Sequence, residues 1–90
     1  MLDLRYTAQF KCDIKRCTRQ NLDLSLLNRV ISTLRIPKAL EPKYKDHPLS
    51  GNHTGKRDCH ILPDWLLLYS YEDNCLVLYR TGSHSELFGT

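Results

Sequence analysis

Hydrophobic residues in the first third of the chain recur at helical spacing. A short strand is expected at residues 3–6, followed by a helix over residues 8–20 that Thr7 is placed to cap. After a polar break, Asp23 is placed to cap a second amphipathic helix over residues 24–35. The apolar stripe of the first helix is formed by Phe10, Ile14 and Cys17. Two amphipathic helices joined by a tight break predict a helical hairpin.

The pattern changes to strand-like alternation in the last third. Residues 36–55 lose periodicity and contain several Pro and Gly, which predicts a long ordered loop or a loop with a helical turn. Three strands are expected at residues 56–62, 65–71 and 75–80, with hairpin spacings between them and a final short turn at residues 85–88. The order β-α-α-β-β-β predicts an α+β fold. The helical hairpin packs on one face of a mainly antiparallel four-stranded sheet and leaves the other face at least partly open.

Length and charge limit the classes of function. Ninety residues suit one small domain over residues 1–90, which excludes a second domain or a deep cofactor cleft. The formal net charge is +3, from 13 Lys and Arg against 10 Asp and Glu. The balance is +4 over residues 1–35, +2 over residues 36–58 and −3 over residues 59–90. The basic part favours a polyanion partner, nucleic acid above all, although a solvated helical surface is the ordinary alternative.

Cysteine usage bears on the compartment and on metal binding. The opening residues lack the apolar core of a secretory signal, and the longest apolar run, at residues 65–69, is too short to span a bilayer. We therefore expect a cytoplasmic protein with reduced thiols and no membrane partner. Cys12 and Cys17 lie about 140° apart around a helix, and neither Cys59 nor Cys75 has a closely spaced cysteine partner. Structural thiols are favoured over a metal site.

Alternation within the expected strands predicts which side chains share a face. In the first of the three strands, His60 shares a polar face with Lys56 and Asp58. The opposite, helix-packed face of that strand carries Arg57, Cys59 and Ile61. In the last strand, one side carries Leu76, Leu78 and Arg80 and the other carries Val77 and Tyr79.

The histidines supply a candidate chemistry. All four fall between residues 47 and 84, and each alone is explained as an ordinary surface imidazole. As a set, beside an arginine and a carboxylate, they are the groups that metal-free cleavage of RNA requires. A base accepts the 2′-hydroxyl proton, an acid protonates the departing 5′-oxygen, and a cation stabilises the charged phosphorane. Imidazole suits both proton transfers near neutral pH, and a guanidinium holds two phosphate oxygens at once.

Three separated motifs carry a resemblance to a known family. They are Tyr44-Lys45-Asp46-His47-Pro48-Leu49-Ser50-Gly51-Asn52, the run from Arg57-Asp58-Cys59-His60 through Pro63-Asp64-Trp65 to Tyr69, and Arg80-Thr81-Gly82-Ser83-His84-Ser85-Glu86-Leu87-Phe88. In this order and spacing they resemble the YafQ group of bacterial toxins, within the RelE/ParE superfamily of type II toxin–antitoxin systems. The resemblance spans essentially the whole chain. It implies a RelE/ParE-like fold and an endoribonuclease that cuts messenger RNA in the ribosomal A site and inhibits translation.

The resemblance also implies roles for individual residues. The functional positions of the family fall on His47, His60, Asp64, Trp65, Arg80, His84 and Phe88. His84 is the candidate general acid, and His47, His60 or Asp64 assists deprotonation of the 2′-hydroxyl. Arg80 stabilises the phosphorane, while Trp65 and Phe88 shape the site or stack on the substrate.

Structural alternatives stand beside three of these roles. Trp65 begins an apolar strand and is equally explained as a core residue, Asp64 after Pro63 as a turn former, and Phe88 as a C-terminal hydrophobic plug.

One segment departs from the family pattern. The family usually has Trp-Lys-Gly-Tyr-Arg where this chain has His53-Thr54-Gly55-Lys56-Arg57. Here His53 and Lys56 replace two aromatic residues. This replacement is a neutral surface change, lowers the stability, or adds cationic contacts to RNA. Lys56 and Arg57 are therefore candidate substrate-binding residues.

The resemblance implies partners as well. These are a cognate antitoxin protein, which also links the toxin indirectly to operator DNA, and the ribosome with its messenger RNA. No cofactor and no metal are expected. Two alternatives from other classes are a ParE-like toxin that binds DNA gyrase without nuclease chemistry, and a small metal- or nucleic-acid-binding module.

Overall fold

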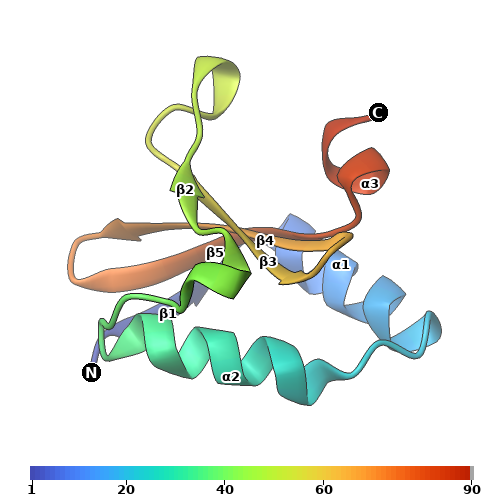
Figure 1. The fold of residues 1–90 in the computed structure, drawn as a ribbon, viewed down its shortest axis with the longest axis horizontal. Coiled ribbons are helices and arrows are strands. Elements are labelled where there is room, and N and C mark those ends of the chain that lie inside the picture. The colour runs from blue at the N-terminus through green and yellow to red at the C-terminus, as the bar shows by residue number, and fades with distance from the viewer. Residues whose placement is uncertain (90) are drawn as a thin grey trace.

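The structure is a computed structural model that describes residues 1–89, and it contains a mixed five-stranded sheet with two long helices on one face (Figure 1). The elements are, in chain order, β1 (Asp3–Tyr6), α1 (Ala8–Arg19), α2 (Leu24–Arg35), the 3₁₀ turn η1 (Pro42–Tyr44), β2 (His47–Pro48), the 3₁₀ turn η2 (Gly51–His53), β3 (Arg57–Leu62), β4 (Trp65–Glu72), β5 (Cys75–Gly82) and α3 (His84–Phe88). The expected α+β class is confirmed, and each expected element is present within two residues of its predicted bounds.

The expected number of strands is wrong by one. The strand order is β1-β5-β4-β3-β2, in which β1 runs parallel to β5 and the other neighbours are antiparallel. The additional strand, β2, pairs His47 with Asp58 and Pro48 with Arg57 at the sheet edge. Two residues are too few to show alternation, and proline in a strand is tolerated at an edge because it donates no hydrogen bond. The rest of the loop holds two 3₁₀ turns.

Both long helices begin at the caps that the sequence predicts. Thr7 Oγ1 accepts a hydrogen bond from Phe10 N, and Asp23 Oδ1 accepts one from Ser25 N. Their apolar stripes pack on the sheet as one buried cluster. The helices contribute Phe10, Cys17, Leu27, Val30, Ile31 and Leu34, and the strands contribute Cys59, Ile61, Trp65, Leu67, Tyr69, Leu76 and Leu78. Among residues 1–89, no helix is both long and apolar enough to cross a membrane.

A bulge in β5 changes the alternation on which the sequence prediction relied. Tyr69 lies opposite Leu78, but its neighbour Leu68 lies opposite Arg80, so Tyr79 is an extra residue in β5. Directly opposed residues share a face, and Arg80 therefore lies on the face of Leu68 and Asp58. The prediction that Arg80 shares a side with Leu76 and Leu78 is wrong, because one extra residue moves every later side chain to the other face.

The face of the sheet away from α1 and α2 is the open face. In Figure 1, β2 with the loop that follows it and α3 both rise from this side, opposite the two long helices. Its floor includes Leu66 and Leu68 of β4, which lie opposite His60 and Asp58 and are at most 1% exposed.

Candidate active site

Three imidazoles form a row across the open face. His47 begins β2, His60 lies within β3, and His84 is the first residue of α3. The ring centroids of His47 and His60 are 6.4 Å apart, and those of His60 and His84 are 5.4 Å apart. The fold thus brings together three residues that lie on separate elements, with His60 in the middle.

Asp64 holds the His84 end of the row. In the turn between β3 and β4, its Oδ1 accepts hydrogen bonds from the His84 backbone N–H at 2.9 Å and from the ring Nδ1 at 2.6 Å. These two bonds lower the pKa of Asp64, the backbone bond first. Because an ionised carboxylate only accepts, Nδ1 carries its proton and Nε2 is the atom left for proton transfer.

A backbone carbonyl holds the His47 end. His47 Nδ1 lies 2.7 Å from the Lys45 carbonyl oxygen, which only accepts, so Nδ1 is the protonated nitrogen of the neutral ring. The preceding residue, Asp46, anchors this strand because its Oδ1 accepts from Tyr69 Oη at 2.6 Å and from Arg57 Nε at 3.3 Å. His47 therefore presents the lone pair of Nε2 to the open face.

A second carboxylate lies beside this lone pair. Asp58 Oδ2 is 3.7 Å from His47 Nε2, while Asp58 Oδ1 is buried and has no hydrogen-bond partner among the described residues. The residue is 4% exposed. Burial raises the pKa of Asp58, although His47, His60 and His84, when they are protonated, act against this shift. The row of imidazoles thus has a carboxylate at each end.

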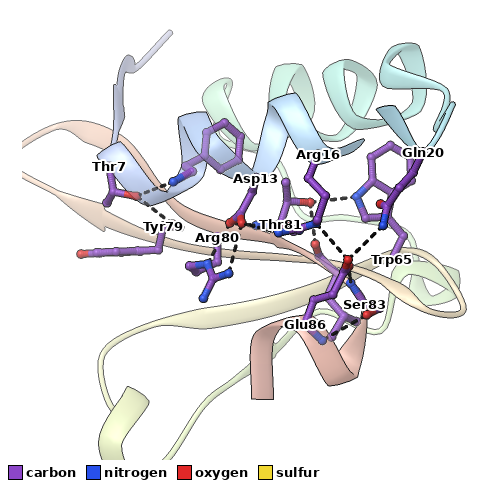
Figure 2. Close-up of polar contacts among 12 residues, drawn as sticks. Thr7, Asp13, Arg16, Gln20, Trp65, Tyr79, Arg80, Thr81, Ser83 and Glu86 are labelled. Atoms are coloured by element: carbon purple, nitrogen blue, oxygen red, sulfur yellow. Dashed lines mark hydrogen bonds and ion pairs between the residues drawn. The ribbon is translucent and has the colours of Figure 1, made fainter. Parts of the chain in front are cut away.

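Arg80 is held from the helix side of the sheet. Its Nε donates to Asp13 Oδ2 at 2.8 Å and its Nη2 donates to Asp13 Oδ1 at 3.1 Å. Figure 2 shows Arg80 on the same side of β5 as α3, with Asp13 reaching it from α1. The hydrogen bonds that Arg80 donates to Asp13, and the negative charge of Asp13, raise the pKa of the Arg80 guanidinium, which is a cation.

Trp65 is a core residue, and its expected role as a stacking surface for substrate is not supported. The side chain is 2% exposed and belongs to the helix-side cluster. Its indole Nε1 donates to Thr81 Oγ1 at 2.8 Å, as Figure 2 shows. A base has no access to a ring that is packed and hydrogen-bonded in this way.

The two candidate substrate-binding cations lie on opposite faces. Arg57 is opposite Tyr69 on the helix side and is paired with Asp46, which removes it from the row of histidines. Arg57 is therefore a structural partner of the loop, and its contact with substrate stays a prediction. Lys56 Nζ lies 4.5 Å from the centroid of the Tyr79 ring, which it contacts as a cation.

Phe88 is the last residue of α3 and contacts the loop that follows β2. Its ring meets that of His53 edge to face, with centroids 5.5 Å apart. His53 lies in η2, so this contact joins the two segments that rise from the open face. Phe88 is half-buried and keeps part of its surface exposed.

Two residues at the site were not singled out from the sequence. Asp58 precedes His60 by two residues, and strand alternation alone places it on the same face. Asp13 lies three residues after Phe10 and one before Ile14, so the helical period places a carboxylate within the buried stripe. A charged residue in such a stripe is the signal that would have identified it.

The chain has clear relatives among known proteins. The family described as "Bacterial toxin of type II toxin-antitoxin system, YafQ" matches residues 2–89. The chain belongs to the YafQ family. The mRNA interferase toxin YafQ of Escherichia coli strain K12 is 40% identical over 89 residues, which are 97% of this chain and 96% of that protein.

Solved structures of bacterial toxins share the fold. A copper-bound mutant toxin from Helicobacter pylori is 44% identical, with a TM-score of 0.94 over 98% of this chain and 100% of that one. YafQ in the E. coli DinJ-YafQ complex is 38% identical, with a TM-score of 0.90 over 99% of this chain and 100% of that one. The resemblance inferred from the three motifs is therefore confirmed. Within residues 1–89, no group of three or more His, Cys, Asp or Glu is placed to hold a metal ion, and independence from metal stays a prediction.

Proposed function

We propose that this YafQ-family toxin is an endoribonuclease that cleaves messenger RNA in the ribosomal A site, without a metal ion, by attack of the 2′-hydroxyl on its own phosphorus. The observation that carries the proposal is the row of three imidazoles on one open face, with a carboxylate at each end. The mRNA interferase name of the E. coli relative supports the substrate class.

His84 acts as the general acid. Asp64 fixes the ring through Nδ1 and stabilises its imidazolium form, in which Nε2 also carries a proton and gives it to the departing 5′-oxygen, leaving the neutral ring. Asp64 is a positioning residue in this scheme rather than a base, because its pKa is lowered and its Oδ1 already accepts two hydrogen bonds.

His47 acts as the general base. Its Nε2 lone pair accepts the proton of the 2′-hydroxyl, and the nearby Asp58 carboxylate stabilises the imidazolium that forms. His60 lies between the base and the acid, where it contacts the reacting phosphate. An acid and a base on opposite sides of the phosphate suit in-line attack, and each contributes about 10²–10⁴ in rate when well placed.

Arg80 stabilises the phosphorane. Its guanidinium has five N–H groups, and Asp13 occupies one edge, which leaves N–H groups for the phosphate oxygens. Phe88 contacts a base beside the scissile phosphate through its exposed surface.

The ribosome and an antitoxin are the proposed partners. A chain of 90 residues with an open face has little surface to orient RNA, and the ribosome would present the message in a fixed geometry. The proposed location is accordingly the cytoplasm. By analogy with the DinJ-YafQ complex, a cognate antitoxin binds the toxin, and the basic helices α1 and α2 favour an acidic partner segment.

Growth arrest and primer extension test the proposal together. Expression of the wild type should arrest growth and give discrete cleaved ends on translated messages. His84→Ala should do neither while keeping the wild-type melting temperature, and Glu41→Ala in the exposed loop serves as the control. Cleavage by folded His84→Ala would contradict the proposed acid. Growth arrest by the wild type without cleaved ends would instead favour a toxin that binds DNA gyrase.

A further inference from the structure

Asp13 is a fully buried carboxylate on a helix whose other charged side chains are basic. It is 0% exposed and lies where α1 crosses β5. An ionised group is costly to bury unless every oxygen is paired. The groups that donate hydrogen bonds to Asp13 therefore indicate its role.

Four hydrogen bonds converge on its two oxygens. Oδ2 accepts from Arg80 Nε at 2.8 Å and from the Thr81 backbone N–H at 3.1 Å. Oδ1 accepts from Arg80 Nη2 at 3.1 Å and from Arg16 Nη1 at 2.8 Å. Burial alone would raise the pKa of Asp13, but the bonds from Arg80, Thr81 and Arg16 outweigh it and lower the pKa.

The contact with Asp13 fixes the orientation of the Arg80 guanidinium plane as well as its position. Two parallel N–H···O bonds hold the Nε–Nη2 edge of the guanidinium. The Nη1 group and the second N–H of Nη2 make up the remaining edge, which extends away from Asp13. In Figure 2 the end of Arg80 points to the side of the sheet on which α3 lies.

The same network reaches the helix that carries His84. Arg16 Nη2 donates to the Thr81 carbonyl at 2.6 Å, and Arg16 Nε lies 2.9 Å from Glu86 Oε2. Glu86 Oε1 accepts from the backbone N–H of Ser83, the N-cap of α3, at 2.8 Å. Gly82 leaves room for this arrangement, since a Cβ there would collide with Arg16 Nη2. A chain of charged groups thus connects Asp13 to both Arg80 and the start of α3 (Figure 2).

We propose that Asp13 is a positioning residue of the ribonuclease reaction, which orients Arg80 from the opposite side of the sheet so that its free edge meets the scissile phosphate. The inference rests on the proposed function and assigns a role to a residue that touches no substrate. Misplacement of a group by about 1 Å costs on the order of 10²-fold in rate.

The test is a double-mutant cycle on cleavage rate in a purified translation system. Asp13→Asn keeps the shape of the side chain and loses its charge, and Arg80→Lys keeps a charge beside position 13 and loses the forked geometry. We expect each single variant to cleave about 10²-fold more slowly, mainly through kcat. The double variant should be no slower than Arg80→Lys alone, because both changes remove one function. Asp23→Ala, which removes the cap of α2, controls for lost stability and should keep the wild-type rate.

The outcomes separate this inference from the proposed function. A folded Asp13→Asn variant with the wild-type rate, or rate losses that multiply in the double variant, would overturn the role of Asp13 and leave the ribonuclease intact. Full cleavage by both His84→Ala and Arg80→Lys would overturn the ribonuclease mechanism itself.

A measurement on the wild-type protein tests the inference even where the Asp13→Asn variant does not fold. In protein with ¹⁵N-labelled arginine, the Nε–H of Arg80 should exchange with solvent much more slowly than that of Arg5, whose side chain is 54% exposed. Equal exchange rates would show that Asp13 does not hold Arg80 and would overturn the inference.

Discussion

The two outer histidines of the row are each fixed through Nδ1, one by a carboxylate and one by a carbonyl. In the proposed mechanism this difference matches their roles, because a carboxylate stabilises a positive ring and a carbonyl selects the neutral tautomer with a free Nε2. Neither partner is apparent from the histidines alone. Lys45 contributes only its backbone, and Asp64 lies 20 residues before His84 in the chain.

The first prediction concerns Asp64. Asp64→Asn keeps an acceptor oxygen and loses the negative charge, so cleavage should fall by about 10²-fold, the lower end of what a well-placed acid contributes. Single-turnover cleavage of a ribosome-bound message measures the change. Asp73→Asn is the matched control, since Asp73 occupies the other hairpin turn and its nearest cation, Arg5, is 3.9 Å away. Equal rates for the two variants would mean that Asp64 only forms a turn.

The second prediction concerns Asp58 and stability. Because its pKa is raised on folding, the folded protein binds this proton more tightly than the unfolded chain does. Its contribution to stability is present below the ordinary value of 3.8 and is lost as pH rises through the raised pKa. Asp58→Asn should therefore gain stability relative to the wild type as pH rises from about 4 to 7, while its cleavage rate falls.

Urea unfolding of both proteins across this pH range measures the effect. The difference between the two curves isolates Asp58, because Asp13 and Asp64, whose pKa values are lowered, titrate in both proteins. Parallel curves would contradict the prediction.

At the scale of elements, the bulge in β5 determines which face of the sheet carries the Arg80 side chain. Tyr79 is the extra residue, and without it Arg80 would point into the helix-side core with Leu76 and Leu78. The bulge thus places a cation on the open face with the histidines and leaves Thr81 beneath α1, where it meets Asp13 and Trp65.

The third prediction tests the assignment of Trp65 to the core. Trp65→Phe removes the hydrogen bond to Thr81 Oγ1 and leaves a partly filled site, at a cost of about 1–3 kcal/mol in the free energy of unfolding. Urea denaturation measures that loss, and the cleavage rate of the folded variant should stay at the wild-type value. Unchanged stability with lost cleavage would restore Trp65 as a substrate contact.

The fourth prediction concerns the contact between the β2 loop and α3. The edge-to-face pair of His53 and Phe88 should couple the two segments by about 0.5–1.5 kcal/mol. The coupling is measured by urea unfolding of His53→Ala, Phe88→Ala and the double variant. Additive losses would mean that the two segments are independent.

At the scale of the whole molecule, the sequence predicted those parts of the fold that depend on local signals. Thr7 and Asp23 cap the helices as expected, and the alternation in β3 places Cys59 and Ile61 in the core. Strand β2 could not be predicted because two residues show no period, and its place depends on pairing with Asp58 and Arg57. The bulge at Tyr79 is visible only in the register between strands.

For the site, the sequence predicted which residues take part but not how they are paired in space. The three motifs led to the histidines, Asp64 and Arg80, because the resemblance carries residue identities. The resemblance does not show which side chains lie next to one another. The pairing of Arg80 with Asp13 spans 67 positions, and the separation of Arg57 from the histidines depends on which face packs against the helices.

The ends of the cleaved message test the central claim most directly. The measurement is the 3′-end chemistry of messenger RNA cut in a purified translation system, with a chelator that removes transition metals and spares the Mg²⁺ of the ribosome. Attack by the 2′-hydroxyl predicts that cleavage persists and leaves a 2′,3′-cyclic phosphate or a 3′-phosphate upstream and a 5′-hydroxyl downstream. A 3′-hydroxyl end, or cleavage abolished by the chelator, would contradict a metal-free acid–base reaction at the row of histidines.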